Sequence, residues 1–166
     1  YEGMVVRDFA CTFLAAIIGE SHAFFAQIGD GAIVIHGHSQ PNVFGCVFAP
    51  QKGQYQNMTY FATFPDAISY VDILRIEDEI IDDVALFTDG IERLAIDFSK
   101  QEPHAPFFTP MFLPLMQSMP TEDGYSPSLS QALQSYLSSS RINEKTDDDK
   151  TLILATRSDK ENANTV

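Results

Sequence analysis

Three short acidic segments lie next to apolar runs in this sequence, and together they could bind divalent cations. Asp30 follows one apolar run, Asp89 directly follows the run 84–88, and Asp148 lies just before the run 151–155. A site whose ligands are all carboxylate oxygens favours Mg²⁺ or Mn²⁺ over zinc. Carboxylates that meet at one point repel each other unless cations lie between them. Two such ions roughly 3.5–4 Å apart can lower the pKa of a bridging water and bind a phosphoryl group.

A plainer interpretation of the same residues needs no metal. Asp-Gly pairs such as Asp89-Gly90 are common in ordinary turns. Asp30 would then be a hairpin turn residue, and the acidic run 147–149 would be a solvated charged segment. Composition alone favours this interpretation, and the metal hypothesis depends on the three segments meeting in space.

The apolar runs predict the elements that would position these aspartates. Short runs rich in β-branched and aromatic residues are typical of strands, and the first three are close enough to be consecutive antiparallel strands. Helical periodicity appears only in the second half, so the fold class is α+β. The predicted strands are 8–18, 23–28, 32–35, 43–49, 57–64, 73–76, 84–88 and 151–155. The predicted helices are 91–96, 107–119, which Pro110 and Pro114 start or interrupt, and one that begins at Ser126.

Length and composition limit the class of protein. A chain of 166 residues with 45% hydrophobic residues is expected to form one domain with a packed core. Its net charge of −13 argues against nucleic acid as a partner, because phosphate binding needs a basic surface. No segment has the length of a membrane span, and we expect no membrane partner. Cys11 and Cys46 lie in apolar runs, which favours two buried thiols in a reducing cytoplasm.

Other residues that could carry chemistry have plainer explanations. His36 and His38 alternate and could share a strand face as metal ligands, but no third ligand is near them in sequence, so a hairpin pair is favoured. His22 and His104 are expected to be structural. The Met-rich segment 111–119 is more typical of a core than of a groove for a partner helix.

Six segments together resemble the metal-dependent protein phosphatase 2C family, in its bacterial serine/threonine phosphatase branch. They occur in the family's order and span nearly the whole chain. They are 7–12, 27–31, 57–59, 87–91, 106–110 and 146–151.

This resemblance implies roles for the three aspartates. Asp89 matches the aspartate of the family's late Asp-Gly motif, which ligates a binuclear metal centre. Asp148 matches the first residue of the final Asp-Asn motif, also a ligand, with Asp149 in place of the asparagine. Asp30 matches the Gly-Asp motif, whose aspartate helps to hold a third, weaker ion.

The resemblance also implies a fold and a reaction. The expected fold is a sandwich of two antiparallel β-sheets flanked by helices. The expected reaction is hydrolysis of phosphoserine or phosphothreonine by a metal-activated water, with two or three Mg²⁺ or Mn²⁺ ions and no catalytic residue beyond the metal ligands. The expected partners are phosphoproteins, such as the products of a serine/threonine kinase.

Two departures from the family pattern shape the expectation. The family's earlier Asp-Gly motif has no match here, so residues 1–156 are expected to be the C-terminal portion of a phosphatase domain and 157–166 a polar tail. The missing N-terminal portion could be a separate segment or chain. Arg93 stands where many relatives carry a further aspartate, with Glu92 as a possible substitute.

The alternative function is a non-catalytic binding or regulatory module, and a third possibility is a half-domain that is stable only with a partner chain.

Overall fold

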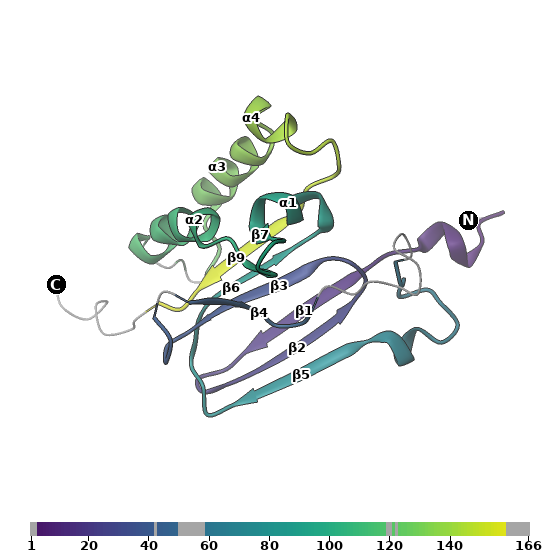
Figure 1. Ribbon diagram of the computed structural model, residues 1–166, viewed down its shortest axis with the longest axis horizontal. Helices are drawn as coiled ribbons and strands as arrows, with labels where there is room; N and C mark the ends of the chain where they lie inside the picture. Colours follow the sequence, from purple (N-terminus) through teal and green to yellow (C-terminus); the bar gives the residue numbers. More distant parts are fainter. Residues whose placement is uncertain (1–2, 42, 50–58, 119–120, 122, 159–166) are drawn as a thin grey trace.

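The computed structural model describes residues 3–41, 43–49, 59–118, 121 and 123–158, and the chain forms three layers (Figure 1). A three-stranded sheet has the order β1-β2-β5, and a four-stranded sheet has the order β4-β3-β6-β9. Both sheets are antiparallel throughout. Helices cover the outer side of the four-stranded sheet (Figure 1). The expected α+β sandwich flanked by helices is therefore confirmed.

Among the described residues, seven strands form the two main sheets. The strands of the two main sheets are β1 Phe13–Ile18, β2 His22–Ile28, β3 Ala32–Gly37, β4 Phe44–Cys46, β5 Asp72–Glu77, β6 Ile81–Phe87 and β9 Leu152–Thr156. A small ribbon pairs β7 Ile96–Asp97 with β8 Glu102–Pro103. The α-helices are α1 Glu92–Ala95, α2 Ala105–Gln117, α3 Pro127–Leu137 and α4 Ser140–Asn143, and the 3₁₀ turns are η1 Val6–Phe9, η2 Ala67–Tyr70 and η3 Asp89–Ile91.

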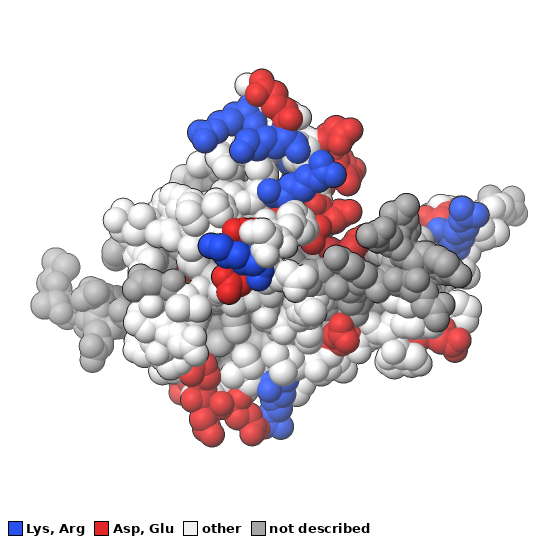
Figure 2. Space-filling view, viewed as in Figure 1, with Lys and Arg blue, Asp and Glu red and all other residues white. Residues whose placement is uncertain are grey.

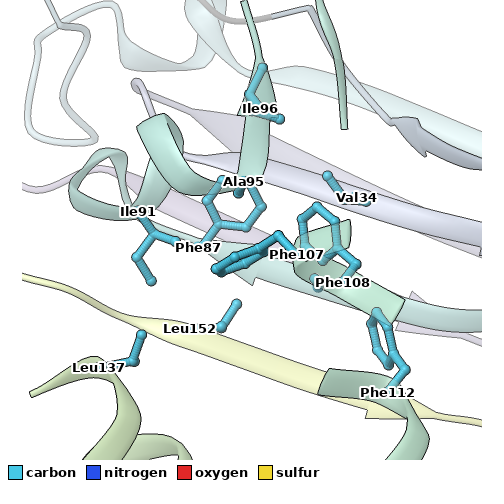
Figure 3. Close-up of a cluster of buried hydrophobic side chains, with 11 residues drawn as sticks. Val34, Phe87, Ile91, Ala95, Ile96, Phe107, Phe108, Phe112, Leu137 and Leu152 are labelled. Atoms are coloured by element: carbon cyan, nitrogen blue, oxygen red, sulfur yellow. The ribbon is translucent and has the colours of Figure 1, made fainter. Parts of the chain in front are cut away.

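Two hydrophobic clusters hold the layers together. Between the sheets, Phe25 of β2 packs in one cluster with Ile33 of β3 and Val84 of β6. Between the four-stranded sheet and the helices, Phe87 packs against Phe108 of α2 with 6.0 Å between ring centroids (Figure 3). Burying an aromatic side chain of this size stabilises the fold by roughly 1.5–3 kcal/mol. The second cluster therefore fixes the end of β6 against α2.

The first three strands do not form one sheet, and that prediction was wrong. β1 and β2 pair as expected, from Phe13 opposite Ile28 onwards. Gly29 then has φ +108°, a left-handed conformation that glycine adopts without the cost of a side chain. This turn directs the chain into the other sheet, where β3 pairs with β4 and β6. The link between β2 and β3 therefore joins the two layers.

Helix α2 passes through both of its internal prolines. The prediction expected Pro110 and Pro114 to start or interrupt a helix, whereas α2 begins at Ala105 and contains both. Each proline lacks a backbone N–H and costs helical stability. The buried Phe108 and Phe112 hold the helix against the sheet and offset that cost. Helix α3 begins at Pro127, as its Ser-Pro start predicted.

Two smaller expectations also need correction, and the structure describes the first residues of the predicted tail. Residues 59–64 form no strand, since 59–61 are irregular and 62–64 form a turn and a bend, and the remaining residues of that prediction, 57–58, lie outside the described ranges. Cys11 is exposed and Cys46 is half-buried, so neither is a fully buried thiol. Arg157 is anchored to the fold, because its guanidinium donates to the carbonyls of Gly19 at 2.7 Å and Ile81 at 3.3 Å. Residues 159–166 of the predicted tail lie outside the described residues.

The outer face of the three-stranded sheet carries apolar side chains that the described residues leave open. The exposed fractions are 52% for Phe13, 73% for Ile17, 43% for Phe24 and 65% for Ile73. Among the described residues, these strands are therefore covered on one face only. In the described part of the chain, no helix combines the length and apolarity needed to cross a bilayer.

Candidate metal centre

The pairing of β3, β6 and β9 brings the three predicted aspartates to one edge of the four-stranded sheet. Ala32 at the start of β3 lies opposite Phe87 at the end of β6, and Phe87 lies opposite Leu152 at the start of β9. Asp30 lies two residues before β3, Asp89 lies two residues after β6, and Asp148 precedes β9. Segments from three distant parts of the sequence therefore meet at this edge.

Hydrogen bonds between Thr88 and Thr151 fix two of these segments to each other. The Thr88 amide donates to the Thr151 carbonyl at 3.2 Å, and the Thr151 amide donates to the Thr88 hydroxyl at 3.1 Å. Gly90 lies so close to the turn before β9 that an added Cβ would be 2.1 Å from the Asp149 carbonyl oxygen. The same Cβ would be 3.4 Å from Cβ of Asp148. Glycine is therefore required for the turns that carry Asp89 and Asp148 to touch.

A buried glutamine holds the third segment. The side-chain amide of Gln27 donates to the Gly31 carbonyl at 2.9 Å and more weakly to the Gly29 carbonyl at 3.4 Å. Gln27 is 1% exposed, and its Oε1 has no hydrogen-bond partner among the described residues. The Thr59 hydroxyl donates directly to Oδ2 of Asp30. Gln27 therefore holds the backbone on both sides of Asp30, and Thr59 contacts the Asp30 carboxylate itself.

The surroundings of Asp89 place it within reach of the charges of Asp30 and Asp148. The pKa of Asp89 is raised above its ordinary value, first by loss of solvent and then by the negative charges of Asp30 and Asp148. Two hydrogen bonds from backbone amides lower the same pKa in part. Asp89 keeps part of its surface in water, so its desolvation is incomplete. A cation at this edge would relieve the repulsion directly.

The donor atoms at this edge fit a hard divalent cation. All three side chains present carboxylate oxygens, which suit Mg²⁺ and Mn²⁺. Within the described ranges, no group of three or more His, Cys, Asp or Glu side chains already has the geometry of a metal site. The three aspartates would supply part of a ligand set, and water or further protein oxygens would complete it.

The remaining candidates are Glu92 and the two histidines of the region after β3 begins. Glu92, the possible substitute ligand, lies close enough to Cys46 for its charge to raise the pKa of that thiol, which burial raises more. His36 lies 2.9 Å from Asp83 through its Nδ1 atom, and His38 lies 3.0 Å from Asp82. Both pairs are at the opposite ends of β3 and β6 from the three aspartates. The two histidines therefore do not form a shared ligand pair.

The prediction missed the residues that position the ligands. Gln27 was visible as the one polar residue in an apolar strand, and that pattern is a usable signal for a buried, hydrogen-bonded side chain. The contacts of Thr88 with Thr151 and of Thr59 with Asp30 join residues far apart in sequence. No local pattern reveals such pairs.

A sandwich of two antiparallel sheets with aspartates gathered at one sheet edge is the architecture expected of a phosphatase 2C domain, and the chain belongs to that family. The family model described as "Protein phosphatase 2C" matches residues 1–155. The chain is 43% identical over 155 residues to Serine/threonine-protein phosphatase 3 of Escherichia coli (strain K12). That match covers 92% of this chain and 57% of the Escherichia coli protein, so the chain spans little more than half the length of this relative.

Solved structures share the fold. The chain matches a crystal structure of a bacterial serine phosphatase with a TM-score of 0.52 at 15% identity, over 96% of this chain and 61% of that one. A variant of a bacterial serine phosphatase with an arginine-to-lysine substitution matches with a TM-score of 0.56 at 14% identity, with the same coverage. These likenesses concern the fold alone.

Proposed function

We propose that the protein is a metal-dependent phosphatase that hydrolyses phosphoserine and phosphothreonine in proteins. The observation that carries this proposal is the meeting of Asp30, Asp89 and Asp148 at one sheet edge, where their charges raise the pKa of Asp89. The name of the Escherichia coli relative, a serine/threonine-protein phosphatase, supports the substrate class. Mg²⁺ or Mn²⁺ would be held by these three carboxylates.

The residues of this chain would hold the metal ion and orient its ligands, and none would attack the substrate. A bound divalent cation would supply a Lewis acid for a phosphoryl oxygen and would lower the pKa of a coordinated water. Asp89 and Asp148 would bind it from turns that Thr88 and Thr151 fix together. Gln27 would keep the Asp30 turn in place. Because the nucleophile would be water, we propose that no phosphoenzyme forms.

Further ligands and partners are part of the proposal. The Escherichia coli relative is longer than this chain, and we propose that the remaining ligands of the two main ions come from outside these 166 residues. The substrates would be phosphoproteins made by a serine/threonine kinase. A cytoplasmic location is supported by the two unpaired cysteines.

Substitution of one ligand in the full-length protein tests the proposal. Asp89→Asn should lower Mn²⁺-dependent kcat/KM for a phosphoserine peptide by roughly 10³-fold, because a metal ion supplies several kcal/mol of charge stabilisation in the transition state. Asp66→Asn is the matched control, since Asp66 is exposed and its side chain caps nothing at η2. Full activity of Asp89→Asn would reject the mechanism. Absence of activity in the unsubstituted protein would favour the binding or regulatory module.

A further inference from the structure

A large groove separates α2 from α3 on the outer side of the four-stranded sheet. Its volume is about 850 Å³, within the range of ligand-binding clefts. The apolar part of its lining includes Met111 and Leu115 of α2 and Leu133 of α3. Pro106, Pro110 and Pro114, which follow one another at four-residue spacing on α2, also line it. The groove can therefore accept an apolar side chain from a partner.

The charged groups in this groove have the opposite sign to the protein as a whole. The chain contains 10 basic and 23 acidic residues. Arg93, Arg141 and Lys145 line the groove, whereas Asp97 is the one acidic residue that the described part of the chain contributes to its lining. Figure 2 shows blue side chains gathered over the α3–α4 end of the helical layer, with red ones beside them. A partner segment with acidic side chains would complement the basic residues of the groove. A basic segment would instead be attracted to the negative charge of the rest of the protein.

The groove continues towards the candidate metal centre. A second cavity of about 480 Å³ lies between α3 and the turn before β9. The two cavities share Ser130, Leu133 and Leu152 in their linings. The second cavity also includes Asp149, the residue directly after Asp148. Arg93, in turn, is one helical turn after Asp89. A polypeptide bound in the groove could therefore reach the carboxylate edge.

We propose that this groove docks the segment of the phosphoprotein substrate beside the phosphorylated residue. An apolar side chain of that segment would enter the cavity between α2 and α3. Acidic side chains next to it would face Arg141 and Lys145 at the rim. This inference rests on the proposed phosphatase function and assigns to it a substrate class, namely phosphosites flanked by an apolar residue and acidic residues.

The first test compares three substrates with variants of the full-length protein. Arg141→Glu/Lys145→Glu should raise KM about tenfold or more for a phosphopeptide with an apolar residue and acidic residues, because like charges then face each other. Ala132→Trp, on the groove side of α3, should raise the same KM by filling the cavity. Both variants should hydrolyse p-nitrophenyl phosphate and a phosphopeptide without these flanks at the unsubstituted rate. The control Lys100→Glu reverses one charge, where the groove variant reverses two, on an exposed lysine outside the lining.

The second test measures binding without hydrolysis. A fluorescein-labelled, unphosphorylated peptide with the same flanks should lose about tenfold or more in affinity for both groove variants, and Lys100→Glu should not change it. Unchanged KM and unchanged affinity in both groove variants would overturn the docking proposal. If the unsubstituted protein hydrolyses nothing, the reaction is wrong, and the peptide-binding comparison still decides whether the groove docks such segments.

Discussion

At the scale of single residues, the raised pKa of Asp89 makes folding stability depend on pH. An aspartate with a raised pKa keeps its proton to a higher pH in the folded protein than in the unfolded chain. The contribution of Asp89 to the stability of the metal-free protein therefore falls as pH rises from the unfolded value, about 3.9, and the loss is complete above the folded value. The causes are loss of solvent and the charges of Asp30 and Asp148.

Removing the charge of Asp89 should therefore stabilise the metal-free protein. We expect Asp89→Asn without metal to melt at a higher temperature than the unsubstituted protein at pH 7, and at the same temperature near about pH 3.5. Saturating Mn²⁺ should raise the melting temperature of the unsubstituted protein but not that of the variant. Differential scanning calorimetry measures both effects. A lower melting temperature for metal-free Asp89→Asn at pH 7 would contradict the repulsion, and Asp66→Asn serves as the control for a lost surface charge.

Gln27 should control metal affinity through the turn that it holds. Gln27→Leu keeps the volume but removes the donor to the carbonyls of Gly29 and Gly31. Loss of a residue that orients a metal ligand typically weakens metal affinity or activity about 10–100-fold. Isothermal titration with Mn²⁺ measures this change. Gln131→Leu, an exposed position on α3, is the matched control, and equal affinities for both variants would show that Gln27 is a packing residue only.

At the scale of elements, the contact between the turn after β6 and the turn before β9 depends on one glycine. In Gly90→Ala the new Cβ would meet the backbone oxygen of Asp149, which cannot move without moving the start of β9. We expect Mn²⁺-dependent hydrolysis in the full-length protein to fall by about tenfold or more, since small displacements of catalytic groups have large effects. Gly45→Ala is the control, because nothing lies within 4 Å of its added Cβ. Equal activity of the two variants would show that the two turns need not touch.

The sequence predicts where the strands and helices lie better than it predicts which strands pair with each other. Short apolar runs with Gly or Asp at their ends located β6 and β9, and the Ser-Pro start located α3. The change of sheet between β2 and β3 was not predictable, because it depends on the left-handed conformation of Gly29 and not on hydrophobic pattern. The alternation in 59–64 resembles a strand, yet these residues form an irregular segment and a turn, across which Phe61 and Phe64 pack edge to face.

The three aspartates of the candidate metal centre are visible in the sequence, whereas the contacts that position them are not. Asp30, Asp89 and Asp148 each end or precede an apolar run, which a reader can see in the sequence. Their meeting depends on strand register, from Ala32 through Phe87 to Leu152, and the hydrophobic pattern does not specify which strands are neighbours. The resemblance to a known family supplied that missing information.

At the scale of the whole molecule, the open apolar face of the three-stranded sheet should make residues 1–166 associate. Ile17 and Ile73 are the most exposed of its four large apolar side chains. Burial of such a patch is favourable at about 25 cal/mol per Å². Sedimentation velocity should show concentration-dependent association that Ile17→Lys/Ile73→Lys reduces. Ile68→Lys is the control, because Ile68 is 86% exposed and lies outside this sheet. A monomer at all concentrations would contradict the expectation.

The short link between β2 and β3 ties ion binding to the alignment of the two sheets. Only residues 29–31 separate a strand of one sheet from a strand of the other, and Asp30 is the middle one. If the sheets slid past each other by one strand residue, roughly 3.3 Å, this link would be dragged with them. Asp30 would then move away from Asp89, and a shared cation would lose a ligand. Occupancy of the site would consequently report on shear between the two halves of the sandwich.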